Sequence, residues 1–144
     1  MDLDLDFDLD LDRPDAMNFR ELEVYQFAVR LLPLAAQVAD VLPQRHASLA
    51  DQLRRASLSI PLDIAEGSGE STGADPRRIS AMARGPAMEC AAIVDACLAL
   101  NLIAQAPAKE ADGLLLSLDR LLSKMCLSGP VQVQVRARPE DTSP

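Results

Sequence analysis

Apolar residues recur every three or four positions through most of the chain, in four segments separated by short polar, proline- or glycine-containing stretches. This spacing is typical of amphipathic helices. It predicts helices over about residues 18–41, 48–66, 75–101 and 107–127. Because the connections are short, consecutive helices must run in opposite directions. The pattern therefore predicts an all-α, antiparallel up-down-up-down four-helix bundle.

Several residues at the ends of these segments are typical helix caps. Asn18 and Glu21 have the spacing of a capping box, which predicts Asn18 as the first N-cap. Gly67 is predicted to stop the second helix. Asp75 followed by Pro76 predicts the start of the third helix, because proline is well tolerated at the first helical position.

Three prolines fall inside the predicted helices, namely Pro33, Pro61 and Pro86. A proline within a helix removes a backbone hydrogen bond and costs ~3 kcal/mol in an exposed helix. We therefore expect kinks at these positions, and at Pro86 either a bend or a short break after Gly85. At Pro61 tertiary packing must offset the cost.

The first predicted helix carries two apolar rows. One row comprises Val24, Phe27, Leu31, Leu34 and Val38, and the other comprises Leu22, Tyr25, Ala28, Leu32, Ala35 and Ala39. A bundle helix with one wet face needs a single apolar stripe. The double row predicts an oligomer, with a subunit contact that buries Leu22, Val24, Tyr25, Phe27 and Leu31. The alternative is that both rows are covered within one chain.

The second predicted helix mixes apolar and polar residues most densely. Its main apolar row is Leu53, Ala56, Ile60 and Ile64, and a second row is Leu58, Leu62 and Ala65. The remaining positions are polar: Gln52, Arg54, Arg55, Ser59, Asp63 and Glu66. Two interpretations are open. The helix is either a kinked core helix with a solvated polar face, or it is buried on two sides and its polar residues pair across a subunit boundary.

Three sequence motifs occur in order between about Asn18 and Met125. They are Asn18-Phe-Arg-Glu-Leu-Glu-Val-Tyr-Gln26, then Gln52-Leu-Arg-Arg-Ala with Ser59-Ile-Pro61 and Ile64-Ala-Glu-Gly67, then Ala83-Arg-Gly85 with Glu89. Together they resemble the four helix bundle protein family, also called 23S rRNA intervening-sequence proteins. The resemblance implies an antiparallel four-helix bundle that often assembles as a ring of five. It also implies relatives of uncertain biochemical function, among them a retroelement accessory protein that contacts nucleic acid and a reverse transcriptase.

The chain departs from the family pattern at several positions. Leu62 and Asp63 stand where the family usually has Ser-Asn, and Pro86 stands where Ser is usual. The family often has basic residues after the position of Gly69, whereas this chain has an acidic and polar segment over 70–75. This last difference weakens the implication of nucleic-acid binding.

Length and composition fit one domain with a helical core. A chain of 144 residues is long enough to form a hydrophobic core. The aromatic content of 3% with no Trp suits helices packed through aliphatic side chains. Residues 1–16 contain seven aspartates and one arginine, so they carry −6 of the net charge of −8. The rest of the chain is nearly neutral, which argues against non-specific DNA binding.

The two ends of the chain are predicted to lie outside the folded domain. Residues 1–16 alternate Asp with Leu or Phe, and we expect a disordered acidic arm. Met17 is an alternative native start, and an arm that mimics nucleic acid is a further alternative. The bundle domain is predicted over 17–128, followed by a flexible tail over 129–144.

No set of residues predicts a catalytic or metal site. Cys90, Cys97 and Cys126 lack zinc-motif spacing, and His46 is the only histidine. The glycine-rich segment 67–73 follows a helix and lacks the Walker lysine. We therefore expect no enzyme, cofactor or small-molecule substrate. The absence of a signal peptide and of a long apolar run predicts a cytoplasmic protein with reduced, buried cysteines and no membrane partner.

These patterns favour a non-enzymatic, self-assembling bundle whose surface recruits another macromolecule. The first partner is the chain itself, in a homopentamer by resemblance. Polar register at the subunit contact is predicted to come from Gln52, Arg54, Arg55, Asp63 and Glu66. The alternative is an accessory protein that contacts RNA or an RNA-binding protein through Arg54, Arg55, Arg77, Arg78 and Arg84. The third hypothesis is an enzyme in which Asp63 and Glu66 of different subunits form a carboxylate pair.

Overall fold

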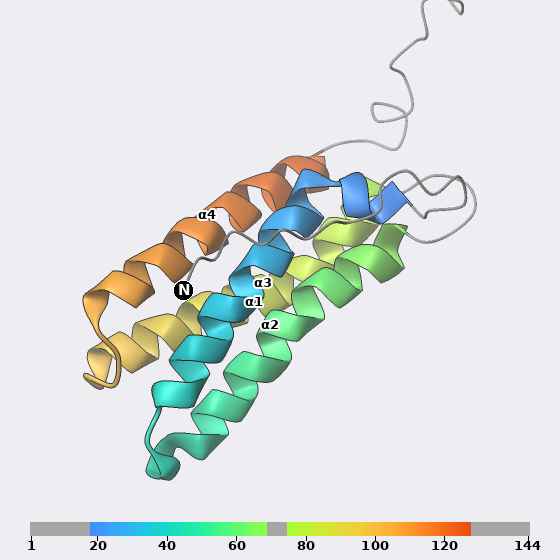
Figure 1. The fold of residues 1–144 in the computed structure, drawn as a ribbon. Coiled ribbons are helices and arrows are strands. Elements are labelled where there is room, and N and C mark those ends of the chain that lie inside the picture. The colour runs from blue at the N-terminus through green and yellow to red at the C-terminus, as the bar shows by residue number, and fades with distance from the viewer. Residues whose placement is uncertain (1–17, 69–74, 128–144) are drawn as a thin grey trace, which may run out of the picture.

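The structure is a computed structural model in which residues 18–68 and 75–127 are described. Its elements are η1 (Asn18–Glu21), α1 (Glu23–Val41), η2 (Gln44–His46), α2 (Ala47–Ser68), α3 (Pro76–Ala99) and α4 (Gln105–Leu127). The four long helices run alternately up and down, and the α1–α2 and α3–α4 connections lie at the same end (Figure 1). The predicted antiparallel four-helix bundle is therefore confirmed.

Each long helix packs against two neighbours. α1 and α3 both contact α2 and α4, whereas neither diagonal pair is in contact. All four helices contribute aliphatic side chains to one core, which includes the fully buried Leu31, Ile60, Ile64, Ile79 and Leu118. A helix with two neighbours keeps roughly half of its surface for solvent or for a partner.

The start of α1 differs from the prediction. The segment beginning at Asn18 forms the separate turn η1, and α1 begins at Glu23 after Leu22 in an extended conformation. Leu22 is partly buried against the core, and the Phe19 ring meets the Tyr25 ring edge-on at a centroid distance of 5.0 Å. These apolar contacts fold the turn back onto α1, so packing overrides the local capping signal.

The two apolar rows of α1 are covered largely within the single chain. Val24 and Leu31 are 3% and 1% exposed, so the prediction that these two side chains bury a subunit contact is wrong. They serve the core instead. Leu22, Tyr25 and Phe27 pack against the core and remain partly exposed. Since α1 contacts both α2 and α4, its apolar side chains are divided between two neighbouring helices of the same chain.

The internal prolines do not interrupt their helices. Pro33 lies within α1, Pro61 within α2 and Pro86 within α3, so the break considered after Gly85 does not occur. Pro61 is buried. Its packing supplies the compensation that the lost hydrogen bond requires.

Gly67 lies inside α2, one residue before its end, so its predicted role as the stop needs correction. A Cβ atom at this position would lie 3.1 Å from both Cα and Cγ1 of Ile79 on α3. Gly67 therefore permits a close approach of the two helices. The predicted cap of α3 is confirmed, since the Asp75 carboxylate accepts a hydrogen bond of 3.0 Å from the backbone N–H of Arg77.

Helix α4 starts at Gln105, two residues before the predicted start at Pro107. The predictions for the acidic arm, the segment 69–74 and the C-terminal tail concern residues outside the described parts of the chain.

Two of the three cysteines belong to the core. Cys90 and Cys97 are buried on one face of α3, whereas Cys126 is exposed near the end of α4. Burial, with a smaller contribution from the charge of Glu89, raises the pKa of the Cys90 thiol to about 12. Burial also raises the pKa of Cys97. Both thiols therefore stay protonated and unreactive at neutral pH.

Replacing Gly67 by alanine should lower the free energy of unfolding by about 1 kcal/mol, because the added methyl group overpacks against Ile79. Gly113→Ala on α4 is the matched control, since a Cβ there meets no atom within 4 Å. The control should raise stability by about 0.5–1 kcal/mol through helix propensity. Urea denaturation monitored by circular dichroism measures both changes, and equal effects of the two variants would contradict the close-approach role.

Brief treatment of the native protein with iodoacetamide, followed by mass spectrometry, should alkylate Cys126 alone. Cys90 and Cys97 should react only after unfolding, because they are buried and their thiolate forms are suppressed. Rapid modification of Cys90 in the native protein would show that the core described here is wrong at that point.

Candidate interaction surfaces

The outer face of α2 exposes two leucines at the centre of the helix. Leu58 and Leu62 are 49% and 58% exposed, and they lie on adjacent turns because they are four residues apart. Isolated exposed leucines are common on protein surfaces. A pair on adjacent turns forms a continuous apolar stripe, which is the kind of feature that marks a contact with another molecule. We call the exposed surface formed by Gln52, Arg55, Leu58, Ser59, Leu62 and Glu66 the α2 outer face.

The leucine stripe is flanked by charges that find no partner within the described chain. Arg55 and Glu66 are exposed, and neither forms an ion pair with another residue of 18–68 or 75–127. Burial and, second, the charge of Glu66 raise the pKa of the Asp63 carboxyl. Asp63 is half-buried at the edge of this face. The α2 outer face thus has the basic Arg55 at one end and the acidic Glu66 at the other, with Asp63 at its edge.

The remaining motif residues of α2 have structural surroundings of their own. Arg54 turns toward α1, where its guanidinium lies 2.9 Å from Asp40, and it also lies 3.4 Å from Asp51. Ser59 donates a hydrogen bond of 2.9 Å to the backbone carbonyl of Arg55. The structure therefore separates Arg54 from the α2 outer face, although Arg54 and Arg55 were predicted to act together.

The arginines proposed for RNA contact do not form one patch of free charge. Arg77 lies 3.5 Å from Asp75, and Arg84 on α3 lies 3.7 Å from Asp119 on α4. Arg78 is exposed and has no acidic partner among the described residues. With the contacts of Arg54, three of the five arginines already face carboxylates of the same chain.

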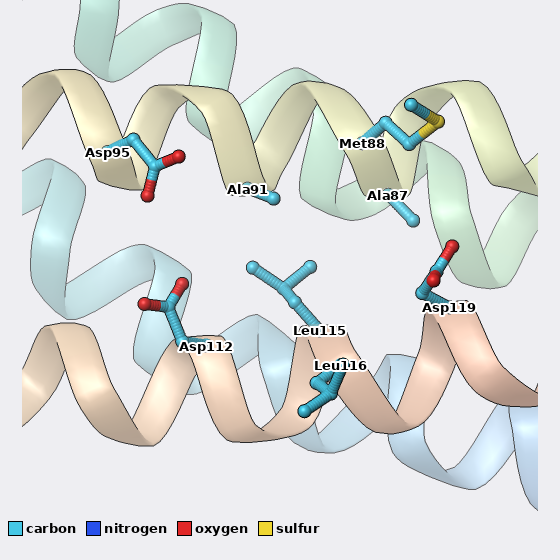
Figure 2. Close-up of a pocket in the computed structure, with 8 residues that line it drawn as sticks. All are labelled: Ala87, Met88, Ala91, Asp95, Asp112, Leu115, Leu116 and Asp119. Carbon is cyan, nitrogen blue, oxygen red and sulfur yellow. The ribbon is translucent and has the colours of Figure 1, made fainter.

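A groove between α3 and α4, which no sequence motif predicted, has a volume of about 450 Å³. Ala87, Ala91 and Leu115 line it, together with Met88 and Leu116, which are 59% and 51% exposed. In Figure 2 the side chains of Ala91 and Leu115 point toward each other across the middle of the groove. Small side chains on α3 leave this space open, and it offers a second apolar surface.

Three aspartates complete the lining of this α3–α4 groove. Asp95 and Asp112 face each other across one end, and Asp119 lies at the other (Figure 2). Burial and, second, the charge of Asp95 raise the pKa of the Asp112 carboxyl. Asp119 is paired with Arg84, whereas Asp95 and Asp112 have no ion-pair partner among the described residues. One end of the groove therefore favours an approaching cation.

A sequence signal for the α3–α4 groove existed in Met88 and Leu116, which fall outside the buried rows of their helices. Their proximity depends on how α3 and α4 are rotated against each other, and a pattern within one helix does not contain that information.

Among residues 18–68 and 75–127, no group of three or more His, Cys, Asp and Glu side chains is placed to hold a metal ion. None of the described helices combines the length and the apolar character needed to cross a membrane.

Comparison with known proteins supports the resemblance carried by the motifs. A comparison with curated proteins gives no match. A family model described as 23S rRNA-intervening sequence protein matches residues 20–124. This range includes the whole of α1, α2 and α3 and most of α4. The match covers well over half of the chain, and the observed four-helix bundle agrees with it. The chain therefore belongs to the 23S rRNA-intervening sequence protein family.

Proposed function

We propose that this protein is a non-enzymatic interaction module that assembles with copies of itself through the α2 outer face. The observation that carries the proposal is the exposed stripe of Leu58 and Leu62 on a helix whose opposite face is fully buried. Water has access to both leucines in a single chain. A neighbouring copy that covered them would remove apolar surface that no described part of the chain covers.

The energetics favour an assembly with several contacts. Covering a half-exposed leucine contributes roughly 1 kcal/mol, since complete burial contributes about 1.5–3 kcal/mol. Two leucines alone do not offset the loss of freedom on association. The subunit contact must therefore include further apolar surface from the neighbouring copy, and a closed ring in which every copy makes two contacts strengthens the whole assembly.

The charges of the α2 outer face support a contact with defined register. Arg55 lies eleven residues from Glu66 along α2, so these two side chains are too far apart to pair on one helix. Opposite charges on a neighbouring copy would pair with them. Such pairs specify geometry more than they add stability, because both partners must lose water.

The number of copies and the wider role of the assembly belong to the same proposal. The family resemblance supports a homopentamer, formed in the cytoplasm and acting as a scaffold that recruits another macromolecule. The described surfaces offer apolar and charged contacts of the kind that protein partners use.

The hypothesis of RNA contact has less support and stays a prediction. Three of the five arginines that motivated it face carboxylates of their own chain, and the α3–α4 groove is acidic. Binding to RNA phosphates would need these cations to exchange partners and would weaken steeply with salt.

Light scattering coupled to size-exclusion chromatography should give a mass that is a multiple of 15.5 kDa, five-fold if the ring has five copies. The double variant Leu58→Gln/Leu62→Gln should reduce the mass to that of one chain, because it makes the apolar stripe polar while the core is unchanged.

Val41→Gln is the matched control, since Val41 is 64% exposed but lies at the end of α1, away from the stripe. It should leave the mass unchanged, and both variants should keep the helical signal of the parent protein. A parent protein that elutes as a single chain at the highest accessible concentration would rule out self-assembly.

A further inference from the structure

We infer that the α3–α4 groove of one copy receives the α2 outer face of a neighbouring copy. The inference rests on the proposed self-assembly and names the two surfaces that meet. They are different parts of the chain, so each copy presents one helix face and one groove. The occupant of the groove is then the same chain, and the contact is heterologous, running from head to tail.

The two surfaces complement each other in polarity. The α2 outer face presents Leu58 and Leu62 as an exposed stripe, and beside it lies Arg55, which has no ion-pair partner among residues 18–68 and 75–127. The α3–α4 groove presents an apolar lining, and its two carboxylates without an ion-pair partner in the described part of the chain are Asp95 and Asp112. In the assembly the leucine stripe would meet the apolar lining of the groove, and Arg55 would meet Asp95 and Asp112. The guanidinium would reduce the electrostatic repulsion between the two carboxylates.

Two contacts within the chain fix the relative heights of the helices. Gly67 on α2 lies opposite Ile79 on α3, and Arg84 on α3 lies opposite Asp119 on α4. Neighbouring helices are antiparallel and rise equally per residue. A residue a given number of positions before such a contact on one helix therefore lies at the same height, meaning the same position along the bundle axis, as the residue equally many positions after it on the other. Leu58 is nine residues before Gly67, and Met88 is nine residues after Ile79. Leu58 and Met88 thus lie at one height.

Arg55 on α2 and Asp112 on α4 also lie at the same position along the bundle axis. Arg55 is twelve residues before Gly67, which places it at the height of Ala91 on α3. Ala91 is seven residues after Arg84, and Asp112 is seven residues before Asp119. Arg55 therefore lies at the height of Asp112. A neighbouring copy placed side by side, pointing the same way and without axial shift, brings this arginine to this aspartate.

The order of charges selects that orientation. In the parallel arrangement Arg55 meets the acidic end of the groove, while Glu66 lies beyond Leu62, toward the end where Arg84 stands. If α2 were reversed about the centre of the leucine stripe, Glu66 would face Asp112, and two carboxylates would repel in a partly desolvated site. Side-by-side docking without axial shift is also a condition for a closed ring, because a rise per copy would produce a helical filament.

The inference is tested by mixing two variants whose defects lie on opposite sides of the contact. Leu58→Gln/Leu62→Gln damages the α2 outer face and leaves the groove intact. Met88→Gln/Leu116→Gln damages the groove and leaves the α2 outer face intact. Each variant alone should have the mass of one chain. Their equimolar mixture should form a complex of twice the 15.5 kDa chain mass, because one intact face remains for one intact groove.

The outcomes separate the two proposals. A parent protein that is monomeric removes both the self-assembly and its geometry. A groove variant that assembles like the parent, while the α2 variant is monomeric, keeps the self-assembly and overturns the groove as its partner. Two monomeric variants that do not combine at the highest soluble concentration also overturn the inference.

A charge reversal provides a second readout that leaves the apolar contact intact. Arg55→Asp alone and Asp112→Arg alone should each shift the assembly toward single chains. The double variant Arg55→Asp/Asp112→Arg should restore the parent mass, since the opposite charges again meet across every contact. Failure of the double variant to recover any assembly, with helical content unchanged, would overturn the predicted pairing and orientation.

Discussion

The packing of the inner face of α2 against α1 and α3 is the contact on which the rest of this structure depends. Leu53, Ile60 and Ile64 are completely buried there, and Gly67 lets α3 approach closely. Once this face is fixed, the helical period places Leu58 and Leu62 outward. A rotation of α2 that hid these two leucines would draw its charged residues into the core, which costs far more.

The two exposed surfaces share a physical origin in the bundle geometry. A helix with two neighbours has an inner half that the core covers and an outer half that it leaves open. On α2 the outer half projects, whereas between α3 and α4 the small side chains of Ala87 and Ala91 leave a hollow. A projection and a hollow of similar height on one chain are the elements that head-to-tail assembly requires.

Charged side chains that pair within the chain have a different role from those that find no partner among the described residues. The pairs of Arg54 with Asp40 and of Arg84 with Asp119 are solvent-exposed, so each contributes between about 0 and 1 kcal/mol. They neutralise arginines that would otherwise attract phosphate groups. By contrast, Asp112 is partly desolvated next to Asp95, and no cation of residues 18–68 or 75–127 pairs with it, so the charge of a partner would have an effect there.

The sequence by itself determined the helical elements and their order. The spacing of apolar residues located all four helices, and the pairing of Asp75 with Pro76 located the start of α3, because these signals act between residues close in the chain. Local signals failed where distant residues compete. Packing of Leu22 moved the start of α1 from Asn18 to Glu23, and contact with Ile79 explains Gly67 better than a helix stop does.

Only the tertiary structure decided which surfaces remain open. It placed Val24 and Leu31 in the core and left Leu58 and Leu62 exposed, although all four belong to apolar rows of similar appearance. It also brought Asp95 and Asp112 to one groove and Arg84 to Asp119, pairs separated by 17 and 35 positions. These results depend on the rotation and height of whole helices, which the packing of the complete core sets and no single helix encodes.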